Sequence, residues 1–129
     1  MIALNVACPH CRHSLMDAEH KLDGNPSIRL LLRVGTDERA LNLSSLYGSF
    51  RYETDAAVGL GTLTELVCPH CRAGLVVDAS CDVCGARMGR LSLEVDGEVY
   101  FCSRRGCKGH KVELRDLEKS LSALYGKAR

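Results

Sequence analysis

The residues of this sequence with the clearest capacity for chemistry are its eight cysteines, which fall into four close pairs. Cysteines paired at this spacing serve as metal ligands, as redox dithiols or as disulfide partners. The start of the chain lacks the basic region and the apolar stretch of a secretory signal, so we expect a cytoplasmic protein whose thiols stay reduced. Metal binding and dithiol redox chemistry are then the main alternatives.

The first two pairs lie in nearly identical stretches, ACPHCRHSL at residues 7–15 and VCPHCRAGL at residues 67–75. A redox dithiol needs a low-pKa cysteine at the start of a helix, within alternating strands and helices. Neither stretch begins a long amphipathic helix, and predicted strands follow strands. We therefore interpret each Cys-Pro-His-Cys as a metal-binding turn, stiffened by its proline. Two such turns supply the four sulfurs of one tetrahedral site.

The third and fourth pairs flank the strongest local signal in the chain. MGRLSLEV at residues 88–95 and EVYFC at residues 98–102 alternate apolar and polar side chains. The Asp-Gly at 96–97 joins them, a dipeptide typical of a type I′ hairpin turn. Residues 81–107 therefore resemble a zinc ribbon. The resemblance implies a four-thiolate zinc site on a β-hairpin, but it implies no particular activity.

The turn Cys81-Asp-Val-Cys84-Gly85 also resembles the metal-binding turns of rubredoxin-like proteins. Glycine after the second cysteine can adopt the positive φ that turns the chain away from the metal. This resemblance implies iron as the alternative to zinc. Arg12 and Arg72 stand in the place of that glycine in the two Cys-Pro-His-Cys turns, whose interpretation therefore rests on the duplication.

Four cysteine pairs can form two sites in three ways, which are sequential, nested and interleaved. Sequential pairing unites the two similar turns and leaves the predicted hairpin with its own pairs, whereas a nested site would crowd around residues 72–80. We therefore expect sequential pairing, with two Zn²⁺ per chain. The expected metal ligands are Cys8, Cys11, Cys68 and Cys71 in one site, and Cys81, Cys84, Cys102 and Cys107 in the other.

The five histidines are expected to lie outside these sites. Four thiolates already fill the tetrahedron of zinc, so His10 and His70 are predicted to point to solvent. His110, shortly after Cys107, is the histidine that could replace a cysteine ligand. No role is predicted for the other two.

The elements that must position the cysteines are mostly predicted strands. Residues 27–34 carry apolar side chains at alternate positions, which indicates a strand with one buried face. Turn-forming residues at 35–38 join this strand to residues 39–46 in a hairpin. The other expectations for this part of the chain are a polar loop at residues 16–27 and short strands at 49–54 and 62–67.

The C-terminal segment has a helical period instead. Leucines recur on one face of residues 113–126, which predicts an amphipathic helix ending at Gly126. The sequence therefore predicts a small, β-rich α+β protein stabilised by metal, with antiparallel hairpins and one C-terminal helix. We expect two units, a sheet closed by the Cys-Pro-His-Cys site at 1–79 and a zinc ribbon with the helix at 80–129.

Filled zinc tetrahedra exclude one class of function. A catalytic zinc keeps an open coordination position, and no catalytic triad, phosphate-binding loop or paired-carboxylate motif stands out. We therefore expect no enzyme, but a zinc-binding scaffold or adaptor that presents a surface to another protein or complex. No small-molecule substrate is inferred. No run of about 18 apolar residues predicts a membrane span.

Two alternatives come from other functional classes. The formal net charge of +1 does not favour nucleic acid, but basic and aromatic residues gather around the second site. They could hold phosphate and stack a base, or simply neutralise the thiolates. The other alternative is a rubredoxin-like iron electron carrier, which zinc content would exclude. The candidate nucleic-acid contacts are Arg87, Arg90, Tyr100, Arg104, Arg105, Lys108 and Lys111.

Overall fold

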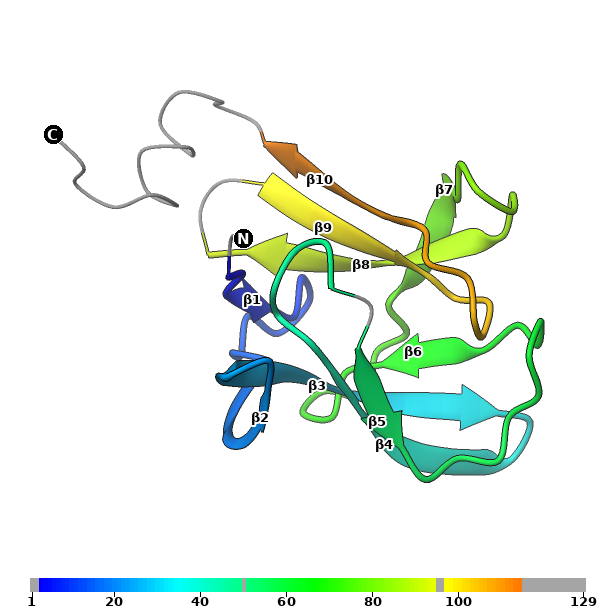
Figure 1. Cartoon of the computed structure of the whole chain (residues 1–129), viewed down its shortest axis with the longest axis horizontal. Helices are drawn as coiled ribbons and strands as arrows, with labels where there is room; N and C mark the ends of the chain where they lie inside the picture. Colours follow the sequence, from blue (N-terminus) through cyan, green and yellow to red (C-terminus); the bar gives the residue numbers. More distant parts are fainter. Residues whose placement is uncertain (1–2, 50, 95–96, 115–129) are drawn as a thin grey trace, which may run out of the picture.

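The computed structural model of the chain describes residues 3–49, 51–94 and 97–114, which form an all-β fold (Figure 1). No helix occurs among these residues. The strands are β1 (Val6–Ala7), β2 (Met16–Leu22), β3 (Asn25–Val34), β4 (Asp37–Leu43), β5 (Tyr52–Thr54), β6 (Glu65–Val67), β7 (Val76–Ser80), β8 (Arg87–Leu93), β9 (Gly97–Cys102) and β10 (His110–Leu114).

The strands form two five-stranded antiparallel sheets. One sheet has the order β2-β3-β4-β5, and β6 also pairs with β3. The other has the order β1-β8-β9-β10, and β7 also pairs with β8. Figure 1 shows the two sheets as separate layers, with β1 lying against β8 and β6 lying against β3.

The same strand arrangement occurs twice along the chain, in residues 3–62 (the first half) and residues 63–114 (the second half). In each half a central strand, β3 or β8, pairs on one side with the strand that follows it. On its other side it pairs with the strand that precedes it and with the first strand of the other half. The two halves thus exchange their first strands, as subunits do in a domain-swapped dimer.

The exchange follows the same register in both directions. Equivalent leucines of the central strands meet the exchanged strands, since Leu32 pairs with Leu66 and Leu93 pairs with Val6. The leucine that ends each repeated stretch then donates its backbone N–H to the exchanged strand, over 3.0 Å from Leu15 to Val6 and 2.7 Å from Leu75 to Leu66. The short sequence repeat is therefore part of a structural repeat that spans the described chain.

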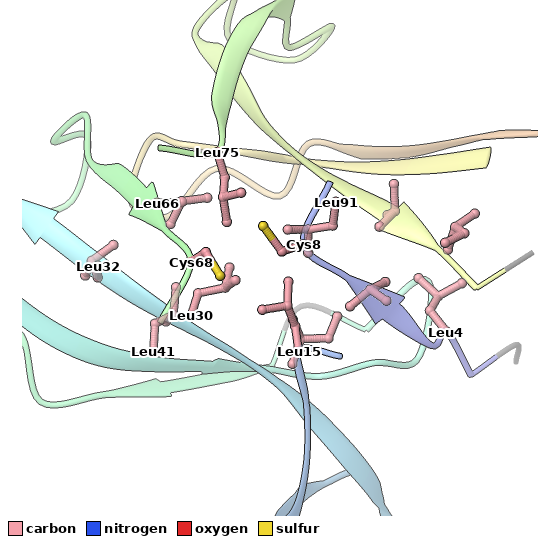
Figure 2. Packing of buried hydrophobic residues seen from close by; sticks show 14 residues of the cluster. Leu4, Cys8, Leu15, Leu30, Leu32, Leu41, Leu66, Cys68, Leu75 and Leu91 are labelled. Carbon is pink, nitrogen blue, oxygen red and sulfur yellow. The ribbon is translucent and has the colours of Figure 1, made fainter. Parts of the chain in front are cut away.

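One apolar core lies between the sheets and takes side chains from both halves (Figure 2). Equivalent positions are buried to the same degree: Leu15 and Leu75 are each 1% exposed, and Leu30 and Leu91 are 0% and 1% exposed. Burying each leucine stabilises the fold by about 1.5–3 kcal/mol, and both halves contribute leucines to this one cluster. Cys8 and Cys68 belong to this same cluster.

The predicted hairpins are confirmed. β3 places Ile28, Leu30 and Leu32 on the buried face, and it pairs with β4 as expected. β8 and β9 form the second hairpin, although residues 95–96 of its predicted turn lie outside the described residues. The predicted loop at 16–27 is wrong, because residues 16–22 form β2. This strand lies at a sheet edge and exposes much of both faces, so its charged sequence carries no alternation to detect.

The predicted α+β class is also wrong for the described residues, which contain no helix. The expected helix at 113–126 begins inside β10, where Glu113 and Leu114 pair with Glu98 and Gly97 of β9. Its residues 115–126 lie outside the described residues. Pairing with an open strand edge satisfies the backbone of residues 113 and 114, and this tertiary contact overrides the helical pattern.

The predicted division into units 1–79 and 80–129 stays a prediction. Strand pairing crosses that boundary, because β1 and β7 both hydrogen-bond to β8.

Candidate metal centres

The first candidate centre lies where the chain crosses between the two sheets. Cys8 and Cys11 stand on the turn between β1 and β2, and Cys68 and Cys71 on the turn between β6 and β7. Figure 2 shows Cys8 and Cys68 among the leucines of the shared core, and both residues are 0% exposed. This centre therefore joins both halves at their crossing points.

The two turns have the same internal geometry. Backbone N–H groups of His10 and Cys11 donate to Cys8 Sγ over 3.3 and 3.4 Å. His70 and Cys71 donate to Cys68 Sγ over 3.3 and 3.5 Å. Such N–H groups favour the thiolate over the thiol, which is the form that binds metal.

Each turn closes on an arginine in the left-handed region, with φ of 67° at Arg12 and 66° at Arg72. This is the position where the third turn has Gly85, with φ of 80°. The conformation costs roughly 1–2 kcal/mol for a residue other than glycine. Each arginine N–H donates to the carbonyl of the first cysteine, over 2.9 Å at Cys8 and 3.0 Å at Cys68, which holds the turn closed. The metal-turn interpretation therefore survives the departure from glycine.

The sulfurs of the first centre have the spacing of a metal tetrahedron. Cys8 Sγ lies 3.7 Å from Cys71 Sγ, and Cys11 Sγ lies 3.8 Å from Cys68 Sγ. A zinc–sulfur distance of about 2.3 Å implies sulfur–sulfur edges of about 3.8 Å. A disulfide would need about 2.05 Å, and all eight cysteines are free. The four sulfurs could therefore hold one metal ion.

The second candidate centre lies within the second half alone. Cys81 and Cys84 stand on the turn between β7 and β8, while Cys102 ends β9 and Cys107 lies in the following loop. The sulfurs of Cys81 and Cys107 are 3.7 Å apart, and those of Cys84 and Cys102 are 3.4 Å apart. Each centre has one exposed cysteine, Cys71 or Cys84, but the first has two buried cysteines and the second has only Cys81, so the second centre lies nearer the surface.

The second centre also depends on a glycine that the sequence analysis did not identify. A Cβ atom added to Gly109 would overlap Cys81 Sγ and come within 3.6 Å of Cys107 Sγ. Any side chain at this position would therefore displace a ligand. The only signal in the sequence is that a glycine follows the last cysteine pair closely.

The thiols of each centre differ in their tendency to ionise. A hydrogen bond from the Ala86 backbone, supported by the Arg104 side chain, lowers the pKa of Cys84 to about 6. Burial raises the pKa of Cys68 to about 12, and burial also raises the pKa of Cys102. Four thiolates at such short distances would need a compensating cation, which a divalent metal ion could supply.

The predicted sequential pairing is confirmed, because the eight cysteines form these two groups and no histidine joins either of them among the described residues. His110 instead accepts a 3.3 Å hydrogen bond from the Gly48 N–H at Nε2, and Tyr47 packs edge-on against it. Burial lowers the pKa of His110. His110 therefore does not replace a cysteine ligand, which the sequence had left open as an alternative.

A histidine without a predicted role lies beside the first centre. The Nδ1 atom of His13 is 3.4 Å from Cys11 Sγ. Its ring stacks on that of His70, with centroids 4.9 Å apart. The stack ties the two Cys-Pro-His-Cys turns together on the exposed side of the centre. The equivalent of His13 in the second turn is Ala73, so comparing the two repeated stretches gives no indication of this contact.

The candidate nucleic-acid contacts separate into groups. Arg90, Tyr100 and Lys111 lie side by side across β8, β9 and β10, with Lys111 Nζ 5.1 Å from the centre of the Tyr100 ring. Arg104, Arg105 and Lys108 instead line a cleft beside the second centre. Arg87 belongs to neither group and lies 3.5 Å from the carboxylate of Asp78.

Comparison of the chain with protein-family models, curated proteins and solved structures gave no match. Among the residues that the structure describes, no helix is long and apolar enough to cross a membrane. The observations that bear on function are therefore the two cysteine clusters, which indicate a metal-binding protein.

Proposed function

We propose that this protein is a non-catalytic, cytoplasmic zinc-binding scaffold that presents a surface to another protein or complex. The observation that carries the proposal is the position of the first centre. Its four sulfurs stand at tetrahedral spacing where both exchanged strands cross between the sheets, with Cys8 and Cys68 fully buried. A metal ion there would be part of the fold rather than an instrument of catalysis.

The donor set supports a closed site. Four thiolates occupy every position of a zinc tetrahedron, whereas a catalytic zinc needs one position for water or substrate. Burial of Cys8 and Cys68 leaves no path for substrate on that side of the first centre. The exposed edge of the second centre, at Cys84, also carries only thiolate donors.

Charge pairing at Arg87 and Lys111 favours a protein partner over nucleic acid. Lys111 Nζ lies 3.6 Å from the Glu113 carboxylate, and Arg87 lies beside Asp78. Glu98 and Glu113 contribute to a raised pKa of Tyr100, after burial as the main cause. Acidic groups within the basic and aromatic row would repel phosphate.

Elemental analysis of the aerobically purified full chain tests the metal. We expect two zinc atoms per chain and a colourless protein, because zinc has no visible absorption from d-electrons. Visible absorption with stoichiometric iron would contradict the proposal and support the electron carrier.

Affinity capture at low salt, with and without nuclease, tests the class of partner. We expect stoichiometric protein partners that survive nuclease and bind the zinc-loaded chain. Partners that nuclease removes would instead support nucleic-acid binding.

A further inference from the structure

An open cleft of about 220 Å³ lies between the first sheet and the loop of the second centre. Apolar side chains from both halves form its floor. Tyr52 at the mouth is 37% exposed. The apolar lining residues are Leu32, Leu41, Leu43, Leu66, Tyr52 and Phe101.

The rim of the cleft is cationic. Arg104, Arg105 and Lys108 line it, and no acidic residue of the described chain does. The Nε atoms of Arg104 and Arg105 are buried without a hydrogen-bond partner among the described residues. The Arg105 guanidinium lies 5.6 Å from the centre of the Tyr52 ring, so cation and aromatic share the mouth of the cleft. Arg104 Nη1 donates to the Gly61 carbonyl over 2.9 Å. Neither arginine is paired with a carboxylate among the described residues, which favours an anionic group from a ligand.

The equivalent place in the other half is filled, so the open cleft does not follow from the repeated fold alone. Strand pairing makes His110 the counterpart of Tyr52, because His110 lies opposite Phe101 as Tyr52 lies opposite Leu43. The counterpart of Arg105 is Tyr47. Tyr47 packs on His110 with ring centroids 4.7 Å apart, and the Gly48 N–H bonds to the same histidine.

Exposed leucines continue the apolar surface beyond the cleft. Leu60 is 78% exposed and Leu63 is 57% exposed. Leu63 forms a backbone bridge with Arg104, and the Leu60 side chain lies over Gly106, where an added Cβ would stand 2.8 Å from Leu60 Cδ2. An apolar surface that extends past the mouth of a small cleft suits a polypeptide better than a small molecule.

We propose that this cleft binds an acidic peptide segment of a partner protein, with one apolar side chain in the cleft and carboxylates on Arg104, Arg105 and Lys108. The inference rests on the proposed scaffold function and names its docking surface. The floor is rich in leucine and offers a nucleobase few hydrogen-bonding groups. The side-chain hydroxyls that line the cleft are those of Tyr52, Thr54, Thr64 and Ser103. Residues 115–129 of this chain carry four basic and two acidic residues, so their charge does not complement the rim.

Selection from a random dodecapeptide phage library against the zinc-loaded full chain tests the inference. We expect enriched sequences in which Asp or Glu flanks one aliphatic or aromatic residue. Synthetic, fluorescein-labelled copies should bind Arg105→Glu and Tyr52→Ala about tenfold or more weakly than the unmodified protein. Arg87→Glu makes the same charge change away from the cleft, so its affinity should stay within about twofold.

Other outcomes overturn the docking surface. They are no enrichment, enrichment of basic sequences, equal weakening by Arg87→Glu, or tighter binding of a labelled oligothymidine or of a peptide of residues 115–129. Zinc content and thermal unfolding of every variant, measured on the same preparations, separate a misfolded variant from a lost contact. A protein with two zinc atoms that fails these tests loses only the docking surface, whereas a protein without zinc would overturn the scaffold function itself.

Discussion

The two halves of this protein close the ends of equivalent strands by different chemistry. In the second half, the candidate ligands Cys102 and Cys107 lie at the end of β9 and in the loop after it. In the first half, Ser44 and Ser49 stand at the equivalent positions, after β4. The backbone is the same in both. Ser44 N–H donates to the Arg51 carbonyl over 2.9 Å, as Cys102 N–H does to Gly109 over 2.9 Å.

In the first half a carboxylate stands where the second half gathers sulfurs. Asp23, on the turn between β2 and β3, accepts hydrogen bonds from the Ser44 and Ser49 hydroxyls, each over 2.6 Å. The Arg51 guanidinium donates to its other oxygen over 3.1 Å. These four residues form what we call the Asp23 clamp. In the first half it joins the turn and loop that are equivalent to those joined by the second centre, and it does so without a metal ion.

The difference between the halves indicates where a bound metal ion would matter most for the fold. The ends of equivalent strands are joined by hydrogen bonds in the first half and by a cysteine cluster in the second. The fold can therefore close this region without the second centre. The first centre has no such substitute, because its two turns come from opposite halves and meet inside the shared core. We therefore expect the two centres to differ strongly in their contribution to stability.

The largest expected effect is that of Cys68→Ser. A structural zinc site contributes on the order of 10–16 kcal/mol, which matches or exceeds the total stability of about 5–15 kcal/mol of an ordinary domain. We expect this variant to lose its cooperative thermal transition and most of its β-sheet circular dichroism at 25 °C. Cys107→Ser is the matched control, which should lose one metal ion and keep a folded first half.

Hydrogen exchange sharpens the same test. In Cys107→Ser, fast exchange should be confined to the neighbourhood of the second centre, while β3 and β4 stay protected. If Cys68→Ser instead kept a protected second half with its own metal, the halves would be independent units. That result would contradict a shared core and support two independent units, with a boundary near residue 62 instead of residue 79.

A smaller effect is expected from Gly109→Ala. The added Cβ would overlap Cys81 Sγ, so the second centre should bind metal more weakly and the protein should lose about 1–3 kcal/mol, the usual cost of overpacking. Arg51→Ala is the matched change at the equivalent position of the first half. It removes an exposed ion pair and should cost about 0–1 kcal/mol. Chelator competition and thermal unfolding measure both, and equal effects at the two positions would contradict the role of Gly109 in the second centre.

The smallest expected effect is that of Asp23→Asn, which weakens the Asp23 clamp and leaves both cysteine clusters intact. Hydrogen bonds from Ser44 and Ser49, together with Arg51, hold the pKa of Asp23 below its ordinary value. A lowered folded pKa stabilises the protein fully above the ordinary aspartate pKa of about 3.9, and this stabilisation is lost as the pH falls through the folded value. We therefore expect Asp23→Asn to unfold a few degrees earlier at pH 7, with both metal ions retained.

Carboxyl ¹³C NMR of the zinc-loaded protein gives the direct readout of the clamp. The Asp23 resonance should titrate below the ordinary aspartate range, and Ser44→Ala should move its pKa upward. An unshifted titration, together with an unchanged unfolding temperature in Asp23→Asn, would show that the clamp contributes nothing.

The features that sequence analysis predicted well are local. The pairing of the cysteines followed from the likeness of two short turns and from a hairpin-length interval. The hairpin β3–β4 followed from the alternation of Ile28, Leu30 and Leu32. Each pattern spans only a few residues, so the physical signal is complete within the segment that carries it.

The features that it missed depend on distant partners. β2 pairs with the edge of β3, and β7 pairs with the edge of β8. Polar side chains on these two strands obscure the alternation that would predict a strand. β10 replaces the start of the predicted helix because β9 offers it an edge. Gly109 matters because it lies against Cys81, and Asp23 matters because it binds Ser44 and Ser49. No local sequence motif connects either residue to these partners.

The sequence by itself identified the candidate donors, since eight cysteines in four tight pairs favour two four-sulfur sites. Only the tertiary structure decided that the first site lies in a core shared by two exchanged halves. It also decided that, in the first half, the Asp23 clamp takes the place equivalent to that of the second site. The reason is physical. Ligand spacing is set within single turns, whereas strand exchange and burial come from contacts between segments far apart in the chain, whose free energy exists only once both halves have come together.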